Sequence, residues 1–193
     1  MRYHNSQVAT WTVVPINAPL VVRNCNKCGT KKEFYCSEKF RMNGRHTKID
    51  IWLIYKCTKC DTTWKLTIKK GIKPHDISAE MFYLFTINDK DLAWRYAFDR
   101  SLLKQNGCDV VYEKVEYRVD GFDTVDLTNP LYLQIKSIYL FELKLASLLA
   151  RMLGLSTSKL KKLVSDGTIR TSPECKIMKY RIRADLEVIL CFQ

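Results

Sequence analysis

Two pairs of cysteines constrain the fold of this chain more than any other feature. Each pair has two residues between its members, in Cys25-Asn-Lys-Cys28 and in Cys57-Thr-Lys-Cys60. This spacing lets the backbone turn tightly and present both sulfurs to one tetrahedral ion. The turn favours a left-handed residue directly after the second cysteine, and Gly29 and Asp61 stand at these two positions. We therefore predict one structural Zn²⁺ bound by Cys25, Cys28, Cys57 and Cys60.

The segments around the second pair have the composition of strands. Residues 49–55 and 62–68 are rich in β-branched and aromatic side chains. Two strands that meet at a pair of cysteines are typical of a zinc ribbon. A shell of four thiolates leaves no open position for a substrate, so we expect a structural role for the metal rather than a catalytic one. Four reduced cysteines without an ion are the alternative.

The net charge of +12 is large for 193 residues and favours nucleic acid or an anionic surface as partner. The charge is uneven along the chain. Residues 1–75 carry a net +11, residues 76–130 a net −5 and residues 131–193 a net +6. We predict three parts with these bounds: a zinc-ribbon domain, an acidic helix–strand connecting segment and a basic C-terminal module.

No segment reaches the roughly 18 apolar residues that a membrane span needs. The apolar stretch of residues 8–22 contains Pro15, Asn17 and Pro19, so we expect strand and turn there, no membrane partner and a cytoplasmic location. Disulfides are rare in that compartment, and eight cysteines therefore point to metal. Cys36 lies between the pairs and could compete as a ligand, but we favour a buried thiol.

The front half resembles a known family. The residues that carry the resemblance are 36–43 (CSEKFRMN) and 50–57 (DIWLIYKC), together with 11–15 (WTVVP) and Trp64. They are similar to an uncharacterised bacterial family described as a domain of unknown function. The resemblance implies a bacterial, cytoplasmic protein and supplies no activity.

A basic, aromatic segment lies between the cysteine pairs. As a loop beside a zinc site, it could hold a phosphate backbone and stack a base. A solvated loop with its phenylalanine in a small core is the alternative. The candidate RNA-binding residues in this segment are Lys39, Phe40, Arg41 and Arg45.

The rest of the chain predicts helices and short strands. Helix-start chemistry at Asn88 or Asp89 predicts a helix that ends near residue 107, followed by a strand over residues 110–119. Residues 139–153 predict a helix, and Ser156 is the expected N-cap of a second helix that ends at Gly167. Residues 168–171 and 186–190 predict strands.

The C-terminal segment also resembles a known motif. Residues 153–169 (LGLSTSKLKKLVSDGTI) are similar to the alpha-L RNA-binding motif, which occurs in a small-subunit ribosomal protein, tyrosyl-tRNA synthetases and pseudouridine synthases. The resemblance implies that several side chains face RNA, and Lys161 shares their basic arc on the second helix. A helical hairpin with a solvated lysine face is the alternative. The candidate residues are Lys144, Ser158, Lys159, Lys161, Lys162 and Arg170.

Together these features predict an α+β protein with a β-rich N-terminal zinc ribbon, a helix–strand middle segment and a C-terminal module of two helices and short strands. The expected function is that of a zinc-containing RNA-binding protein, associated with the ribosome or with tRNA and without catalytic activity. A DNA-binding zinc-ribbon regulator and an enzyme whose site is not visible in the sequence are the alternatives. No pattern identifies a protein partner.

Overall fold

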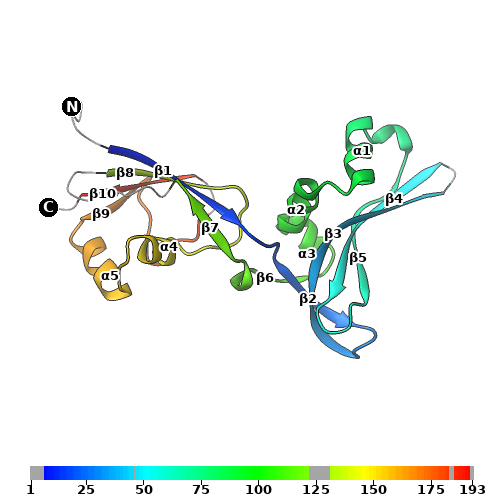
Figure 1. Ribbon diagram of the computed structural model, residues 1–193, viewed down its shortest axis with the longest axis horizontal. Helices are drawn as coiled ribbons and strands as arrows, with labels where there is room; N and C mark the ends of the chain where they lie inside the picture. The colour runs from blue at the N-terminus through cyan, green and yellow to red at the C-terminus, as the bar shows by residue number, and fades with distance from the viewer. Residues whose placement is uncertain (1–6, 46, 122–130, 183–184, 192–193) are drawn as a thin grey trace. The chain divides into compact units, whose positions relative to one another are not determined.

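The structure is a computed structural model that describes residues 7–45, 47–121, 131–182 and 185–191 (Figure 1). The chain divides into two compact units. The cysteine unit comprises residues 17–115, and the terminal unit comprises residues 1–16 together with 116–193. The boundaries between the units therefore fall at other places than the boundaries of the three segments that the charge distribution predicts.

The cysteine unit contains a five-stranded antiparallel sheet in the order β5-β4-β3-β2-β6. Side chains alternate between the two faces of each strand. On β4, for example, Ile51, Leu53 and Tyr55 are fully buried, while Trp52 and Ile54 between them lie on the other face. The strands are β2 (Leu20–Cys25), β3 (Thr30–Arg45), β4 (Lys48–Cys57), β5 (Thr63–Ile72) and β6 (Asp109–Val111).

Three helices cover one face of this sheet, and α1 and α2 contact β3 (Figure 1). Each begins at a side chain that accepts a hydrogen bond from a backbone amide: Ser78, Asp89 and Asp99. Because the helices pack on the face of Leu53, the face of Trp52 remains open. The helices are α1 (Ala79–Ile87), α2 (Lys90–Phe98) and α3 (Arg100–Gln105), and the short 3₁₀ turns are η1 (Pro74–Asp76) and η2 (Tyr112–Lys114).

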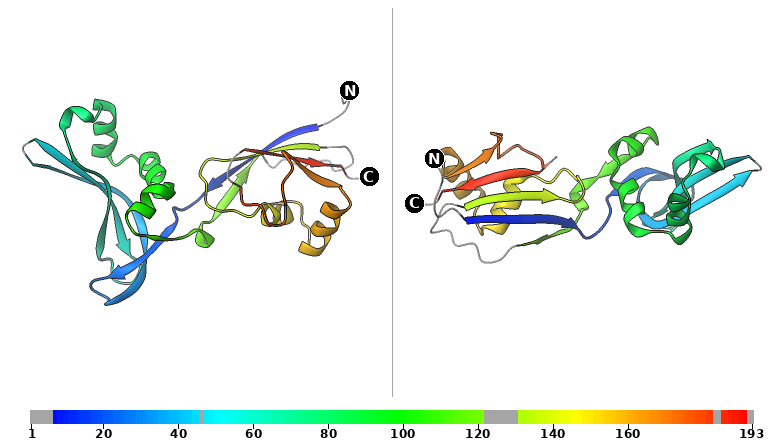
Figure 2. Two further views of the ribbon diagram at one scale, coloured as in Figure 1. Left: turned by 180° about the vertical axis from the view of Figure 1, so that it is seen from behind. Right: turned by 90° about the horizontal axis from the view of Figure 1, so that it is seen from above.

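The terminal unit has a second five-stranded sheet, in the order β7-β1-β8-β10-β9 (Figure 2). Strand β1 pairs in parallel with β8, although more than a hundred residues separate them in the sequence. Helices α4 and α5 supply buried leucines to the core of this unit. The elements are β1 (Gln7–Pro15), β7 (Tyr117–Asp120), β8 (Leu131–Ser137), α4 (Leu145–Met152), α5 (Thr157–Ser165), β9 (Ile169–Ser172) and β10 (Leu186–Leu190).

The predicted fold class is wrong. The chain is β-rich and forms two five-stranded sheets, and it contains no separate C-terminal module of two helices and short strands. Helices α4 and α5 belong instead to a unit whose sheet takes β1 from the N-terminal end of the chain. The physical reason is long-range pairing: β1 buries Trp11 and Val13 by lying beside β8, so the first strand does not join the cysteine unit.

The predictions for single helices and strands agree with the structure better than the predicted fold class does. The expected caps at Asp89 and Ser156 are confirmed, as are strands β9 and β10. The helix predicted from residue 89 to 107 is two helices, because Asp99 takes an extended conformation and begins α3. The strand predicted over residues 110–119 is likewise divided between β6, η2 and β7. No helix within the described residues is long and apolar enough to cross a membrane.

Candidate metal centre and the open face of its sheet

Four cysteine sulfurs converge at one end of the sheet of the cysteine unit. The two pairs stand at the β2–β3 turn and the β4–β5 turn, so both turns belong to antiparallel hairpins. All four sulfur atoms lie within 4.8 Å of one another, and Sγ of Cys25 is 3.4 Å from Sγ of Cys60. Zn–S bonds of about 2.3 Å in a tetrahedron place sulfurs about 3.8 Å apart. The group of Cys25, Cys28, Cys57 and Cys60 therefore has the dimensions of a metal-binding site.

Both turns have the same backbone geometry, as the sequence predicts. Gly29 has φ +68° and its amide donates to the Cys25 carbonyl at 2.9 Å. Asp61 has φ +58° and its amide donates to the Cys57 carbonyl, also at 2.9 Å. A left-handed residue after each pair thus reverses the chain and leaves the two sulfurs of the pair on the same side.

The environment of the sulfurs combines burial with hydrogen bonding. Cys25 and Cys57 are buried and belong to the hydrophobic core under the helices. Hydrogen bonding with the side chain and with the backbone of Thr62 lowers the pKa of Cys60 to about 6. Hydrogen bonding with Cys60 is the largest of the causes that raise the pKa of Cys28 to about 12. A bound cation deprotonates coordinating thiols outright, and such an ion would make thiolates of all four.

The remaining cysteines lie outside this cluster. Burial raises the pKa of the Cys36 thiol to about 12, which suits a packed neutral thiol rather than a ligand. Its cross-strand neighbour is Tyr55, whose side chain is fully buried. Cys36 therefore behaves as a small apolar residue of the sheet.

The open face of the same sheet is basic. In register across β3, β4 and β5, it presents Arg41, Trp52 and Thr67 in one row and Lys39, Ile54 and Lys65 in the next. Lys39, Arg41 and Lys65 are exposed. Residues 20–72 contain 13 lysine and arginine side chains against 4 aspartate and glutamate, a net +9. Residues 73–115, which include the helices, contain 6 against 7, a net −1. The charge of this unit is therefore concentrated in its sheet.

The four carboxylates of residues 20–72 are all engaged within the unit. Glu33 binds Lys114 at 2.6 Å, and Glu38 accepts a 2.7 Å hydrogen bond from Nε1 of Trp94. Asp50 accepts a hydrogen bond from the amide of Gly71. Asp61 accepts from Lys56 at 2.6 Å and from the Tyr35 hydroxyl at 2.8 Å, which lowers its pKa.

Three cations on this face have no such partner. Within the described residues, no carboxylate lies within 4.0 Å of the side-chain nitrogens of Lys39, Arg41 or Lys65. Their charge is therefore available to an external anion.

The chain belongs to the family DUF1062, described as a protein of unknown function. This assignment rests on a match over residues 42–175, more than half of the chain. No curated protein and no solved structure matches the sequence. The DUF1062 match includes Trp52, Cys57 and Cys60 and begins after Cys25 and Cys28. It continues into the terminal unit and ends just after β9.

The candidate residues of the front half are divided between the two faces of the sheet. Residues 39–45 form part of strand β3 rather than a loop, with Lys39 and Arg41 on the open face. Phe40 faces the helices, where its ring lies 4.9 Å from that of Phe85. Arg45 ends β3, and its side chain lies outside the described residues.

An aromatic residue lies among these cations on the basic face, Trp52, which sequence reasoning missed as a functional candidate. The Lys65 ammonium lies 5.0 Å from the centroid of its ring. An exposed cation–π contact of this kind contributes about 0.5–1 kcal/mol. Residues 51–55 (IWLIY) are all apolar, so the sequence does not separate the two faces of this strand, and the burial of Ile51 and Leu53 in the structure is what places Trp52 on the other face.

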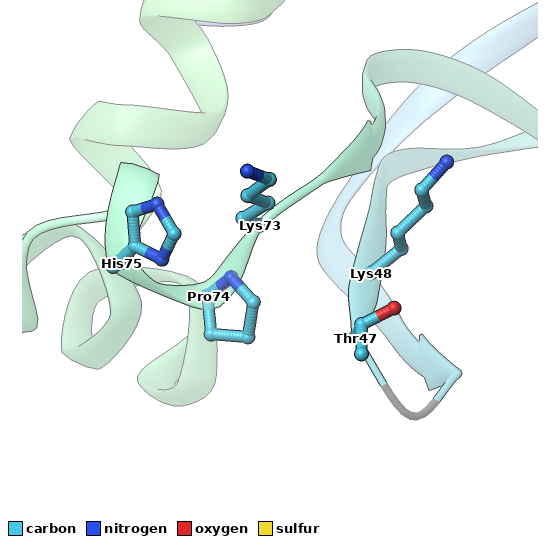
Figure 3. A pocket seen from close by; sticks show the side chains of 5 residues that line it. All are labelled: Thr47, Lys48, Lys73, Pro74 and His75. Atoms are coloured by element: carbon cyan, nitrogen blue, oxygen red, sulfur yellow. The ribbon is translucent and has the colours of Figure 1, made fainter.

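A pocket of about 410 Å³ lies at the end of the sheet where β3 meets β4 (Figure 3). One wall comes from the start of β4 and the other from the connection between β5 and α1 (Figure 3). Its lining contains no carboxylate within the described residues, so its chemistry suits an anion better than a cation. The lining residues are Thr47, Lys48, Lys73, Pro74 and His75.

The C-terminal candidates lie in the terminal unit and are not on one surface. Lys159, Lys161 and Lys162 are exposed on α5, and Ser158 is exposed in its first turn. Lys144 is the exposed N-cap of α4. Arg170 is exposed on β9, where its neighbours Ile169 and Thr171 are buried on the other face, towards α5. The sheet therefore separates Arg170 from the lysines of α5.

Proposed function

We propose that this protein is an RNA-binding protein whose four cysteines hold one structural Zn²⁺, and that the open face of the cysteine unit is the binding surface. The cysteine unit carries 19 basic and 11 acidic side chains, a net +8, whereas the terminal unit carries 13 and 9, a net +4. A zinc ion with four thiolates contributes −2, so the bound cysteine unit stays at about +6.

The choice of metal follows from the ligands. Four sulfur ligands in a tetrahedron select zinc or iron, and a closed shell of four cysteines is the usual structural zinc site. The ion would join the β2–β3 turn to the β4–β5 turn and fix the strands that present the basic face. Elemental analysis of the purified protein checks this: we expect one zinc and no iron per chain. Loss of zinc after substitution of all four cysteines by serine is the second expected result.

The observation that carries RNA binding is the group of Lys39, Arg41 and Lys65, three cations that pair with no carboxylate of the described residues and lie beside a half-buried Trp52 on an open sheet face. Phosphate contacts by lysine and arginine supply affinity that falls with salt concentration. The lysines of the pocket at the start of β4 add positive charge at one end of the same sheet. This surface offers charge for the backbone and an apolar ring for a base.

The test compares two variants with the same loss of charge. One replaces Lys39, Arg41 and Lys65 by glutamine, and the other replaces Lys159, Lys161 and Lys162 on α5 by glutamine. We expect the first to lower affinity for RNA and to reduce the slope of log K against log salt by about 2, since each lost single-strand contact contributes about 0.7. The second variant should retain most of the slope. The opposite ranking would move the binding surface to α5 and reject the open face.

A further inference from the structure

The side chains around Trp52 form a small array on the open face of the cysteine unit. Arg41 on β3 and Thr67 on β5 are its direct cross-strand neighbours. Lys39 and Lys65 lie one row further along the same two strands, at the diagonal positions. Diagonal neighbours in a sheet lie roughly 7–8 Å apart, within reach of long side chains. An indole ring on this face therefore has three cations among its direct and diagonal cross-strand neighbours.

Packing of the hydrophobic core does not explain the position of Trp52. The core residues that contact the helices come from the other face of the sheet and include Phe34, Leu53 and Trp64. Trp52 keeps part of its surface accessible, and its recorded ring contact is with the exposed Lys65. A partly exposed tryptophan among cations, on a sheet face that no helix of its unit covers, is available to a flat external ligand.

We propose that Trp52 stacks against an unpaired base, so that the ligand of this face is a single-stranded nucleic acid. The inference rests on the proposed function and specifies its ligand. A base takes the position of the Lys65 ammonium over the ring, because stacking on an aromatic ring is the stronger of the two contacts. Lys65, once displaced, joins Lys39 and Arg41 in binding the phosphates on either side of that base.

A double helix does not offer the same contact. In a duplex each base is stacked on its neighbours, and a protein reaches only the backbone and the base edges. A sheet face with a partly exposed indole ring and neighbouring cations fits a splayed single strand instead. RNA and DNA share the base and phosphate chemistry used here, so the experiment includes both.

The experiment measures binding of the full-length protein to three labelled probes by fluorescence anisotropy. The probes are a 12-nucleotide single-stranded RNA, the single-stranded DNA of the same sequence and the RNA as a blunt duplex. We expect single strands to bind at least tenfold more tightly than the duplex. Trp52→Leu should weaken single-strand binding by about 5- to 100-fold, leave duplex binding unchanged and retain the salt dependence. Trp52→Phe should restore part of the affinity.

Two controls separate stacking from damage to the fold. Tyr132→Leu removes a half-buried aromatic ring from strand β8 of the terminal unit, and its single-strand affinity should match that of the wild type. Zinc content should be the same in Trp52→Leu and wild type. Quenching of tryptophan fluorescence by the bound strand gives a direct reading, and we expect most of it to disappear in Trp52→Phe.

The outcomes distinguish the two proposals. Equal affinity for duplex and single strand, with no effect of Trp52→Leu, rejects stacking while salt-dependent RNA binding through the open face stands. No binding of any probe rejects both proposals. Tighter binding of DNA than of RNA keeps the stacking role of Trp52 and changes the ligand to single-stranded DNA.

Discussion

The two units of this protein are each built from a five-stranded sheet with helices on one face, but their sheets are held together in different ways. In the terminal unit, β1 and β8 pair in parallel across more than a hundred residues, and this pairing buries Trp11 and Ile135 side by side. In the cysteine unit the neighbouring strands β2 to β5 form successive antiparallel hairpins. Long-range strand pairing holds together the sheet of the terminal unit. In the cysteine unit, a cluster of four thiols joins two of the hairpin turns.

The two sheets also differ in the charged side chains on the face that the helices of each unit leave uncovered. The face around Trp52 gathers the lysine and arginine side chains Lys39, Arg41 and Lys65, whereas in the terminal unit the corresponding face mixes Gln134 and Glu187 with Lys136. A surface that gathers like charges needs strands that are held rigidly by something other than those side chains. A metal ion bound by the four cysteines would join two hairpin turns of the cysteine unit and so help to hold the strands that carry this surface.

Removal of the metal gives the largest expected difference between the units. A structural zinc site contributes roughly 10–16 kcal/mol of apparent binding free energy, which is available only to the folded state. Chelation, or Cys25→Ser with Cys57→Ser, should unfold the hairpins of the cysteine unit and leave β1, β8 and β10 protected. Hydrogen exchange resolved by peptide measures both at once. Cys175→Ser is the matched control, and protection of β2 to β5 that survives chelation would contradict the comparison.

The sequence predicts the cysteine unit better than the terminal unit, because the information in the former is local. The spacing of each cysteine pair, with Gly29 and Asp61 behind it, was sufficient to predict the cluster and its backbone geometry. The β-branched and aromatic composition of residues 49–55 predicts a strand, and β4 is formed there. The parallel pairing of β1 with β8 has no local signature, so the N-terminal strand was assigned to the wrong unit.

The candidate binding residues show the same limit. Lys39 and Arg41 can be selected from their charge alone, but the choice of Trp52 over Phe40 requires knowledge of which face the helices cover. The exposed lysines of α5 follow from helical periodicity. That Arg170 lies on the far face of the sheet from α5 depends on the packing of α5 against β9, which no periodicity encodes.

Removal of a large core side chain from the terminal unit tests whether long-range strand pairing stabilises that unit separately from the cysteine unit. Trp11 is fully buried in β1, and Trp11→Ala should destabilise the terminal unit by about 3–5 kcal/mol through lost burial and the cavity left behind. Denaturant unfolding followed by peptide-resolved exchange measures the effect. Zinc content and protection of β3 and β4 should remain those of the wild type. Loss of zinc in this variant would show that the two units do not fold separately.

Substitutions in the two cysteine turns should have a smaller effect on stability. Gly29→Ala should destabilise the cysteine unit by about 1–2 kcal/mol, the cost of a left-handed conformation in a residue with a Cβ. An added Cβ meets no atom within 4 Å, so this cost is conformational rather than steric. Asp61→Gly is the counterpart: it relieves the same strain and loses the exposed hydrogen bonds to Tyr35 and Lys56. Chemical denaturation of the zinc-bound protein should rank Gly29→Ala as the less stable variant.

The smallest expected effect is a change of stability at low pH, which should have a different cause in each unit. In the terminal unit, Asp166 accepts hydrogen bonds from the Thr168 hydroxyl and amide, and these lower its pKa below the usual 3.8. A lowered pKa in the folded state adds stability above pH 4 that is lost as the pH falls through the folded value. Asp166→Asn should remove this dependence, with a change in Tm of no more than about 4 °C at neutral pH.

The cysteine unit should respond to acid earlier and more strongly, because its metal ligands bind as thiolates and protons compete with the ion. Parallel titrations of zinc release and of peptide-resolved exchange, from pH 7 down to pH 3, separate the two responses. We expect zinc loss and exposure of β2 to β5 at a higher pH than any change in β8 or β10. Because Asp166 is exposed and acts within one turn, its variant should leave the zinc-release curve unchanged. A single acid transition shared by both sheets would instead mean that the metal centre stabilises the whole chain.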